Sequence, residues 1–117
     1  MNISKLSALT GVSVRSLRYY EAKGILRSER LENGYRDFQE SAVDRVKLIQ
    51  LYLGLGLSSN EIAHIIDCPV SISDQKPLCE KAIKAYQSKL AEVENQIEIL
   101  QKLRLQLYQR ISNYVET

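Results

Sequence analysis

The sequence contains few of the residues from which active sites and metal centres are built. Among its 117 residues there is one histidine, His64, and there are two cysteines, Cys68 and Cys79. We find no clustered nucleophile and base and no phosphate-binding glycine loop, so we do not expect an enzyme. Two cysteines are too few for a disulfide framework, and we expect both to be free thiols in a reducing cytosol.

Long apolar segments are also missing. No stretch approaches the roughly 20 uncharged apolar residues that span a bilayer, because Lys, Arg or Gln interrupts the longest apolar runs. Residues 1–12 carry one lysine and no continuous apolar core, which is not typical of a signal peptide. The composition, 44% hydrophobic and 26% charged, is that of an ordinary globular protein. We therefore expect a cytoplasmic protein with no membrane partner.

The net charge of +2 is small, but its distribution along the chain is uneven. Residues 1–36 carry seven Lys and Arg residues against three Glu residues, a net charge of +4, whereas residues 37–117 carry a net charge of −2. A basic head on a mildly acidic body favours an oriented encounter with a polyanion such as nucleic acid. Charge alone leaves the alternative of a solvated basic face open.

Residues 3–24 have the pattern of two short helices joined by a tight turn. Apolar residues recur at helical spacing from residue 3 to residue 9, and Gly11 ends this first helix. Ser13 is a suitable N-cap for a second helix, which Gly24 ends. This layout is typical of a helix-turn-helix.

Residues 25–38 predict a two-stranded hairpin around Asn33 and Gly34. Asn-Gly is the dipeptide that supplies the positive φ angles of a two-residue type I′ turn. A hairpin directly after a helix-turn-helix is a wing. We therefore expect a winged helix-turn-helix.

A third helix is expected from about residue 39 to residue 54, because apolar residues recur there at helical spacing. A fourth helix is expected over roughly residues 59–67. Ser58 and Glu61 have the spacing of a capping box at its start, and Pro69 prevents its continuation into the turn-rich residues 68–77. The faces that we expect to be buried comprise Val43, Val46, Ile49 and Leu53 in the third helix and Ile62, Ile65 and Ile66 in the fourth.

The C-terminal part of the chain has the pattern of a coiled coil. Between residue 78 and about residue 114 there is no Gly or Pro, and a heptad is sustained throughout. Such a helix is more than about 50 Å long and cannot bury its apolar stripe on so small a head. We therefore expect a homodimer, the alternative being a helix folded back on its own head. The expected interface comprises the a positions Ile83, Leu90, Ile97, Arg104 and Ile111 and the d positions Tyr86, Val93, Leu100, Leu107 and Tyr114.

Together these patterns predict an all-α fold with a small β-hairpin wing. The winged helix-turn-helix head is expected over residues 1–76, and the coiled-coil dimerisation helix over residues 77–117. Arg104 is the one charged side chain in the expected seam, where such a residue lowers stability but fixes register or orientation.

The chain resembles the MerR family of bacterial transcriptional regulators. The family pattern is T-[IL]-R-Y-Y-E, then G-[LI]-[LI], an Arg and G-Y-R-x-[YF], in the order and spacing found here. Ser16 replaces the usual Thr and Phe38 the frequent Tyr. Further along the chain, the family's G-F-[ST]-x-x-E-I is matched by L-G-L-G-L-S-S-N-E-I, so the resemblance covers the whole chain. The residues that carry the motif are Arg15-Ser16-Leu17-Arg18-Tyr19-Tyr20-Glu21, Lys23-Gly24-Ile25-Leu26, Arg30 and Gly34-Tyr35-Arg36-Asp37-Phe38.

The resemblance implies that the second helix enters the major groove and that the wing contacts the DNA backbone. Arginine forks onto a guanine edge or a phosphate, and tyrosine donates to a phosphate. Tyr20 either packs in the core or contacts DNA, and we favour packing. The residues implied in DNA binding are Arg15, Ser16, Arg18 and Tyr19 in the helix and Tyr35 and Arg36 on the wing.

The resemblance also implies a mechanism. Two heads held by an antiparallel coiled coil read an inverted repeat between promoter elements that are spaced too far apart. The effector-bound form bends and untwists the spacer, so that RNA polymerase, an indirect partner, engages both elements. No cofactor is implied, and the sequence does not distinguish activation from repression.

The inducing signal stays open. Cys79 lies where metal-sensing members of the family have a cysteine at the start of the dimerisation helix, and C-x6-Y-x2-K-L resembles that subfamily. Residues 80–117 contain no Cys or His, so the thiolate loop that completes the subfamily's site is missing and we expect no metal. Cys68 and Cys79 are therefore inert thiols, a thiol redox sensor or, with the partner chain, a metal site. His64 is expected to be a surface or packing residue.

Two other functions compete with an effector-controlled regulator. One is an effector-independent DNA-binding accessory protein with the same head and the same dimer. The other is a coiled-coil adaptor whose head binds protein, and the wing and the basic recognition face count against it.

Overall fold

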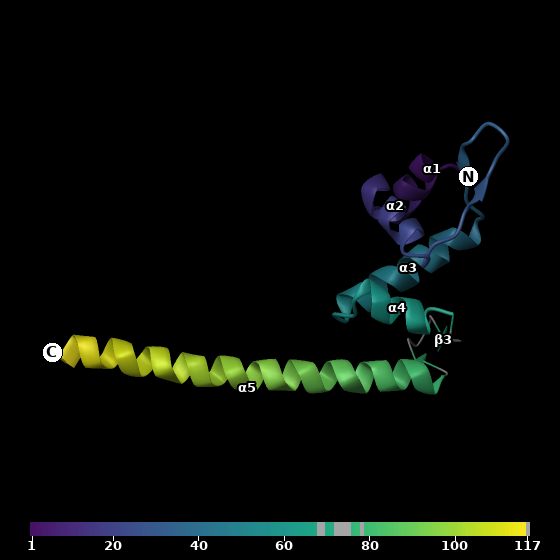
Figure 1. Cartoon of the computed structure of the whole chain (residues 1–117). Helices are drawn as coiled ribbons and strands as arrows, with labels where there is room; N and C mark the ends of the chain where they lie inside the picture. The colour runs from purple at the N-terminus through teal and green to yellow at the C-terminus, as the bar shows by residue number, and fades with distance from the viewer. Residues whose placement is uncertain (68–69, 72–75, 78, 117) are drawn as a thin grey trace. The chain divides into compact units, whose positions relative to one another are not determined.

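A computed structural model describes residues 1–67, 70–71, 76–77 and 79–116 of the chain. It divides into two compact units, Met1–Ile83 and Lys84–Thr117 (Figure 1). The predicted architecture of helices, a small antiparallel hairpin and a long C-terminal helix is confirmed. The elements are α1 (Ile3–Thr10), α2 (Val14–Ala22), β1 (Glu29–Arg30), β2 (Arg36–Asp37), α3 (Ser41–Gly54), α4 (Ser59–Ile65), β3 (Val70–Ser71), β4 (Lys76–Pro77) and α5 (Glu80–Glu116).

Local capping interactions set the ends of the short helices. The Ser13 hydroxyl accepts a hydrogen bond from the Ser16 amide at the start of α2. At the start of α4, the Ser58 hydroxyl accepts from the Glu61 amide while the Glu61 carboxylate accepts from the Ser58 amide, so the predicted capping box is confirmed. Gly11 follows α1 with a φ of 75°, a left-handed conformation that glycine adopts without strain.

The wing is a hairpin, but its turn differs from the predicted one. The Gly34 amide donates to the Leu31 carbonyl oxygen at 2.9 Å, which places Glu32 and Asn33 at the centre of the turn instead of Asn33 and Gly34. Gly34 follows with a φ of 85°, and the Asn33 side chain accepts from the Tyr35 amide at 3.1 Å. A turn followed by a left-handed glycine adds one residue to the loop compared with a type I′ hairpin. The predicted two-residue turn is therefore wrong by one position.

A second hairpin lies between α4 and α5, where only a turn-rich connection was predicted. Strand β3 pairs antiparallel to β4, with Val70 opposite Pro77 and Ser71 opposite Lys76. Each strand has two residues and β4 contains a proline, so neither carries the alternating pattern from which a strand is predicted. The pairing brings the two halves of this connection together before α5 begins.

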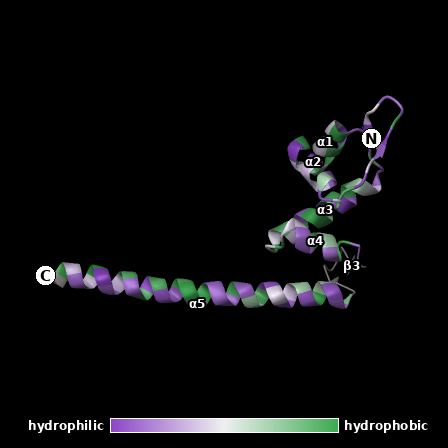
Figure 2. Cartoon of the chain, in the orientation of Figure 1, coloured by the Kyte–Doolittle hydropathy of each residue, from purple (hydrophilic) through white to green (hydrophobic). Residues whose placement is uncertain are grey.

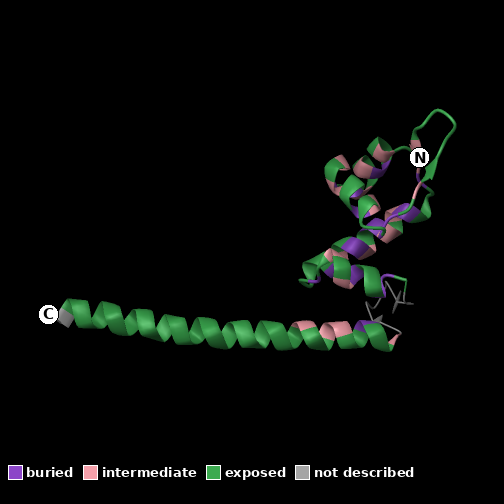
Figure 3. Ribbon diagram, in the orientation of Figure 1, coloured by how far each residue is buried: buried purple, intermediate pink, exposed green. Residues whose placement is uncertain are grey.

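The core of the head is formed by the inward faces of α1–α4. Leu6, Leu17, Val46, Ile49 and Ile62 have no exposed surface, and burying such a side chain contributes about 1.5–3 kcal/mol relative to leaving it exposed. Buried residues gather in this part of the chain in Figure 3.

The predicted buried face of α3 is correct for Val46 and Ile49, whereas Val43 is only partly buried. Leu53 is exposed, and Tyr52 occupies the core position with none of its surface accessible. Counting from Ile49, Tyr52 lies three positions on and Leu53 four, so helical spacing alone allows either residue to follow it on the inner face. In α4 and its C-cap, Ile62, Ile65 and Ile66 are all buried as predicted.

Helix α5 has 37 residues and carries apolar side chains along its length (Figure 2). Ala82, in its first turn, is buried. From residue 90 onward every side chain described is exposed in the single chain, as the continuous green ribbon in Figure 3 shows. No helix among the described residues is long and apolar enough to traverse a bilayer.

Candidate nucleic-acid interface

Helix α2 separates its apolar from its basic residues. Leu17 and Tyr20 are buried, whereas Arg15, Arg18 and Tyr19 are exposed on the opposite side. The exposed side carries two guanidinium groups and a phenol, which donate to phosphates and base edges. The helix therefore presents a surface suited to DNA while its other side anchors it to the head.

Tyr20 packs in the core, as predicted. Its phenol oxygen accepts a hydrogen bond from Gln50 Nε2 of α3 at 2.6 Å. Burial raises the pKa of Tyr20, and the hydrogen bond from Gln50 opposes that shift. Tyr20 thus connects α2 to α3 and is not part of the exposed face.

Tyr19 is held by residues of two helices, although half of its surface is exposed. Its phenol oxygen lies 3.2 Å from the Ser59 hydroxyl in the first turn of α4. The Lys23 ammonium lies 5.7 Å from the centroid of its ring, within cation–π range. Ser59 was missed by the sequence analysis, because no local pattern connects two residues 40 positions apart.

Ser16 contributes to the cap of α2. Its amide and hydroxyl both contact the Ser13 hydroxyl, at 3.1 and 3.0 Å. The side chain is partly exposed at the start of the helix, next to Arg15. Ser16 therefore orients the first turn of the exposed face.

Tyr35 and Arg36 lie on the wing but differ in their surroundings. Tyr35 is 71% exposed in the loop between β1 and β2. Arg36, in β2, forms an ion pair through Nε with Glu21 of α2, and Glu21 also accepts a hydrogen bond from the Ser28 hydroxyl. These contacts connect the recognition helix to the base of the wing.

Glu21 is the acidic residue of the α2 motif, and the structure explains its place beside a basic face. Its side chain is four-fifths buried, and its carboxylate contacts Arg36 and Ser28. The charge of Arg36 compensates that of Glu21, so the acid does not present a free negative charge to a polyanion. The role of Glu21 could not be predicted from the sequence, since its two partners come from other segments of the chain.

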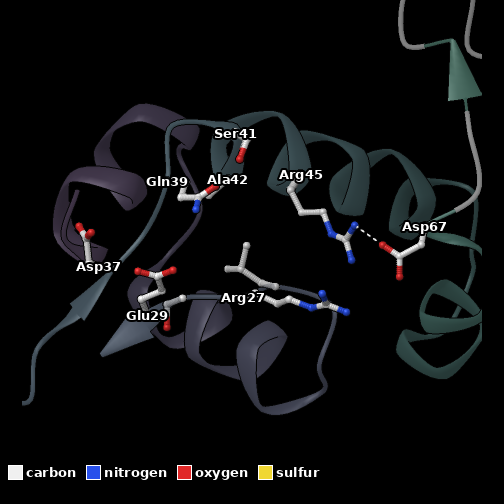
Figure 4. A pocket seen from close by; sticks show the side chains of 10 residues that line it. Arg27, Glu29, Asp37, Gln39, Ser41, Ala42, Arg45 and Asp67 are labelled. Carbon is white, nitrogen blue, oxygen red and sulfur yellow. Dashed lines mark hydrogen bonds and ion pairs between the residues drawn. The ribbon is translucent and has the colours of Figure 1, made fainter. Parts of the chain in front are cut away.

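A pocket of about 530 Å³ lies between the wing and α3 (Figure 4). Arg45 spans it, donating through Nε to the Ile25 carbonyl at 2.8 Å and through Nη1 to Asp67 at 2.7 Å. The hydrogen bond and the charge of Arg45 lower the pKa of Asp67. Asp37, also at the edge of the pocket, pairs with the Met1 amino group at 2.8 Å. Arg45, Asp67 and Asp37 are therefore each held by another group of the head.

The predicted dimer positions form an uncovered stripe on α5. Leu100 and Leu107 are each 63% exposed, and Tyr86, nearer the start of the helix, is half-buried. The Arg104 guanidinium lies 5.5 Å from the centroid of the Tyr108 ring, so its charge lies against an aromatic face at the edge of the stripe. The exposed predicted positions are Ile83, Leu90, Val93, Ile97, Leu100, Arg104, Leu107, Ile111 and Tyr114.

The cysteine prediction needs a correction. Cys79 is disulfide-bonded, so the expectation that it is a free thiol is wrong. We expected a free thiol because the cytosol is reducing. In the structure, the pairing of β3 with β4 brings two segments of the α4–α5 connection together just before Cys79. The other cysteine, Cys68, lies outside the described residues.

His64 is exposed near the end of α4, in agreement with its predicted surface position. Within the described parts of the chain, no three His, Cys, Asp or Glu side chains gather in a way that would hold a metal ion.

Comparison with known proteins identifies similar regulators. A family model described as "MerR HTH family regulatory protein" matches residues 1–67, and one described as "MerR, DNA binding" matches residues 43–109. The HTH-type transcriptional regulator HmrR of Rhizobium leguminosarum bv. viciae is 32% identical over 105 residues, which are 89% of this chain and 78% of that protein.

Solved structures share the fold. The transcription regulator PbrR691 of Ralstonia metallidurans CH34, in complex with lead(II), superposes with a TM-score of 0.77 at 22% identity, over 92% of this chain and 81% of that one. HiNmlR, a MerR family regulator lacking the sensor domain and bound to promoter DNA, gives a TM-score of 0.55 at 22% identity, over 98% and 90% of the two chains.

Proposed function

The chain belongs to the MerR HTH family of regulatory proteins, and from that premise we propose that it acts as a homodimer on an inverted-repeat promoter site and distorts the spacer DNA. It is a DNA-binding transcriptional regulator, and its family is one of regulators rather than enzymes. We further infer that it works in the cytoplasm, where its DNA target lies, and affects RNA polymerase indirectly through the shape of the promoter.

The exposed face of α2 carries this proposal. Arg15, Arg18 and Tyr19 point away from the core on a helix that Ser16 helps to cap, and Tyr35 is exposed on the adjoining wing. A recognition helix reads base edges in the major groove, while a wing adds phosphate contacts that fix the register. Arg36, whose Nε is engaged by Glu21, is proposed to reach a phosphate with its remaining guanidinium nitrogens.

The exposed stripe of α5 supports the homodimer. A contiguous apolar surface on a 37-residue helix marks an interaction site, because soluble chains rarely leave one uncovered. A second copy covers it with an identical stripe, as in a two-stranded coiled coil. The proposed interface residues are those of the predicted seam, and the Arg104 guanidinium is stacked on Tyr108 at its edge.

The test begins by selecting duplexes that bind the protein from fragmented genomic DNA. The proposal predicts recovery of an inverted repeat, protected on one face of the helix, and a bend measured by energy transfer between dyes at the duplex ends. Leu100→Asp, which places a charge in the seam, should leave monomers that bind such duplexes weakly. Ile99→Asp, at the outer c position of the same heptad, is the matched control. Recovery of single, unrepeated half-sites or a straight bound duplex would contradict the proposal.

A second candidate function is thiol-based redox sensing, and the disulfide at Cys79 favours it over metal sensing. Two-electron reduction by a low-molecular-weight dithiol would break the S–S bond, leave two thiols and oxidise the dithiol to its own disulfide.

Promoter transcription in vitro, measured with oxidised and with dithiothreitol-reduced protein, tests this second candidate. Redox sensing predicts that the unaltered chain gives different transcription levels when oxidised and when reduced. Cys79→Ser should give the level of the reduced protein under both conditions. Equal transcription from oxidised and reduced protein would remove the cysteines from sensing and favour an effector-independent accessory protein. Bound metal in native protein, found by mass spectrometry, would favour a metal site instead.

A further inference from the structure

The hydrogen bond between Tyr19 and Ser59 connects the DNA-facing side of α2 with the first turn of α4. The two oxygens lie 3.2 Å apart, and either group has a proton to donate. Tyr19 is 50% exposed and Ser59 is partly exposed, so the pair sits at the surface and not in the core. Because both groups are accessible to water, this hydrogen bond does not serve to satisfy a buried polar group. Its effect is to restrain the Tyr19 side chain.

The surroundings of Tyr19 restrain its ring from three directions. Tyr20 contacts it edge to face, with 6.4 Å between the ring centroids. Lys23 lies over the ring, and Ser59 holds the phenol oxygen at the far end of the side chain. A side chain that is already fixed in its bound orientation loses less conformational entropy when it binds. The phenol is thus held in one orientation before any DNA arrives.

Ser59 is itself held firmly. It follows Ser58, whose capping box with Glu61 fixes the first turn of α4. Its hydroxyl has no other hydrogen bond among the described residues. The serine hydroxyl therefore acts as a fixed anchor in α4 for a side chain of α2.

We propose that Ser59 is a positioning residue for DNA binding, which acts through Tyr19; the inference rests on the proposed function of the α2 face. In the complex, the Ser59 hydroxyl donates to the Tyr19 oxygen, and the Tyr19 hydroxyl donates its proton to a DNA phosphate oxygen. Hydrogen bonds in such a chain polarise and strengthen one another, and the last one is assisted by the charge of the phosphate. Ser59 thereby orients the phenol toward the backbone without contacting DNA itself.

Five variants (Ser59→Ala, Tyr19→Phe, the double variant of the two, Ser59→Thr and Asn60→Ala) and the unaltered chain test the proposal by titration of a selected duplex at fixed salt. Ser59→Ala should weaken binding about three- to tenfold, the range expected for one lost hydrogen bond. In a Tyr19→Phe background the same change should weaken binding less than about twofold, since the phenol it acts on is gone. Ser59→Thr keeps the hydroxyl and should bind like the unaltered chain. Asn60→Ala, at the next exposed position of α4, is the matched control and should also bind unchanged.

The salt dependence and a measurement without DNA give independent readouts. Neither Ser59→Ala nor Tyr19→Phe changes a charge, so the slope of affinity against salt should stay the same for both. In free protein, three-bond couplings should report one χ1 rotamer for Tyr19 in the unaltered chain and in Ser59→Thr, and averaging in Ser59→Ala.

Equal losses for Ser59→Ala with and without the Tyr19 hydroxyl would overturn the proposal, because Ser59 would then act independently of Tyr19. An unchanged affinity or an unchanged Tyr19 rotamer in Ser59→Ala would overturn it as well. If the unaltered chain binds no duplex while the rotamer of Tyr19 still depends on Ser59, the proposed function of the α2 face fails and the positioning role for DNA fails with it.

Discussion

The ion pair between Glu21 and Arg36 is the contact through which the wing is fixed to the recognition helix, and it gives a quantitative prediction. Glu21→Gln keeps the size of the side chain but removes its charge. The side chains of Arg36 and Glu21 are 29% and 20% exposed, and Ser28 also donates to the carboxylate. The substitution therefore leaves a largely buried guanidinium without a charged partner.

The size of the effect lies between two known limits. Exposed ion pairs contribute about 0–1 kcal/mol, and breaking a fully buried pair costs about 3–5 kcal/mol. For a pair that is roughly three-quarters buried, we expect a loss of about 1–3 kcal/mol in the free energy of unfolding. In a domain of this size, each 1 kcal/mol lowers the midpoint of thermal unfolding by about 4–8 °C.

Urea and thermal unfolding, followed by circular dichroism at one fixed protein concentration, measure this effect. Glu98→Gln is the matched control, because Glu98 pairs with Lys102 at 3.5 Å with both side chains more than half exposed. We expect the control to change stability by less than about 0.5 kcal/mol. If Glu21→Gln and Glu98→Gln unfold at the same midpoint, the Arg36 pair does not hold the wing and the reasoning is refuted.

Three further predictions concern the face of α2, the cap of α4 and the pocket. Arg18→Ala should weaken duplex binding about tenfold, the effect of one lost arginine contact, without changing the dimer mass; unchanged affinity near 0.15 M salt would remove Arg18 from the interface. Ser58→Ala should lower the free energy of unfolding by about 1 kcal/mol, because the capping box is lost. If urea titrations show that Ser58→Ala loses less stability than Ser59→Ala, this prediction is contradicted. The lowered pKa of Asp67 means that its contribution to stability, present above the ordinary Asp pKa of about 4, is lost as the pH falls through the lowered value. Asp67→Asn should abolish that loss, which is at most about 1 kcal/mol for so exposed a carboxylate. If urea titrations show that the free energy of unfolding falls equally with decreasing pH in both proteins, the role of Arg45 is contradicted.

Features determined by neighbouring residues could be predicted from the sequence. The caps at Ser13 and Ser58 each depend on residues three positions away, and the structure forms both. The separation of α2 into a buried and an exposed face follows from helical periodicity, although periodicity alone did not decide between packing and DNA contact for Tyr20. The wing was located correctly, although its turn centre shifted by one residue because Gly34 takes the left-handed position after the turn.

Features that depend on distant segments were out of reach. Glu21 meets Arg36 through the packing of the wing on α2, and Tyr19 meets Ser59 across 40 positions of sequence. No periodicity or cap signals such a contact. The disulfide at Cys79 was not predicted either, because the redox chemistry of the cytosol favoured a free thiol. The contacts that fix the DNA-facing residues in place therefore had to come from the structure.

Sedimentation equilibrium in the presence and absence of duplex DNA tests the central claim most directly. Because the stripe on α5 is uncovered in one copy, the free protein should have twice the 13.4 kDa mass of the chain. Addition of a selected inverted repeat should give a complex of two chains per duplex. A single chain in solution that leaves every duplex unbound, even at low ionic strength, would contradict the account.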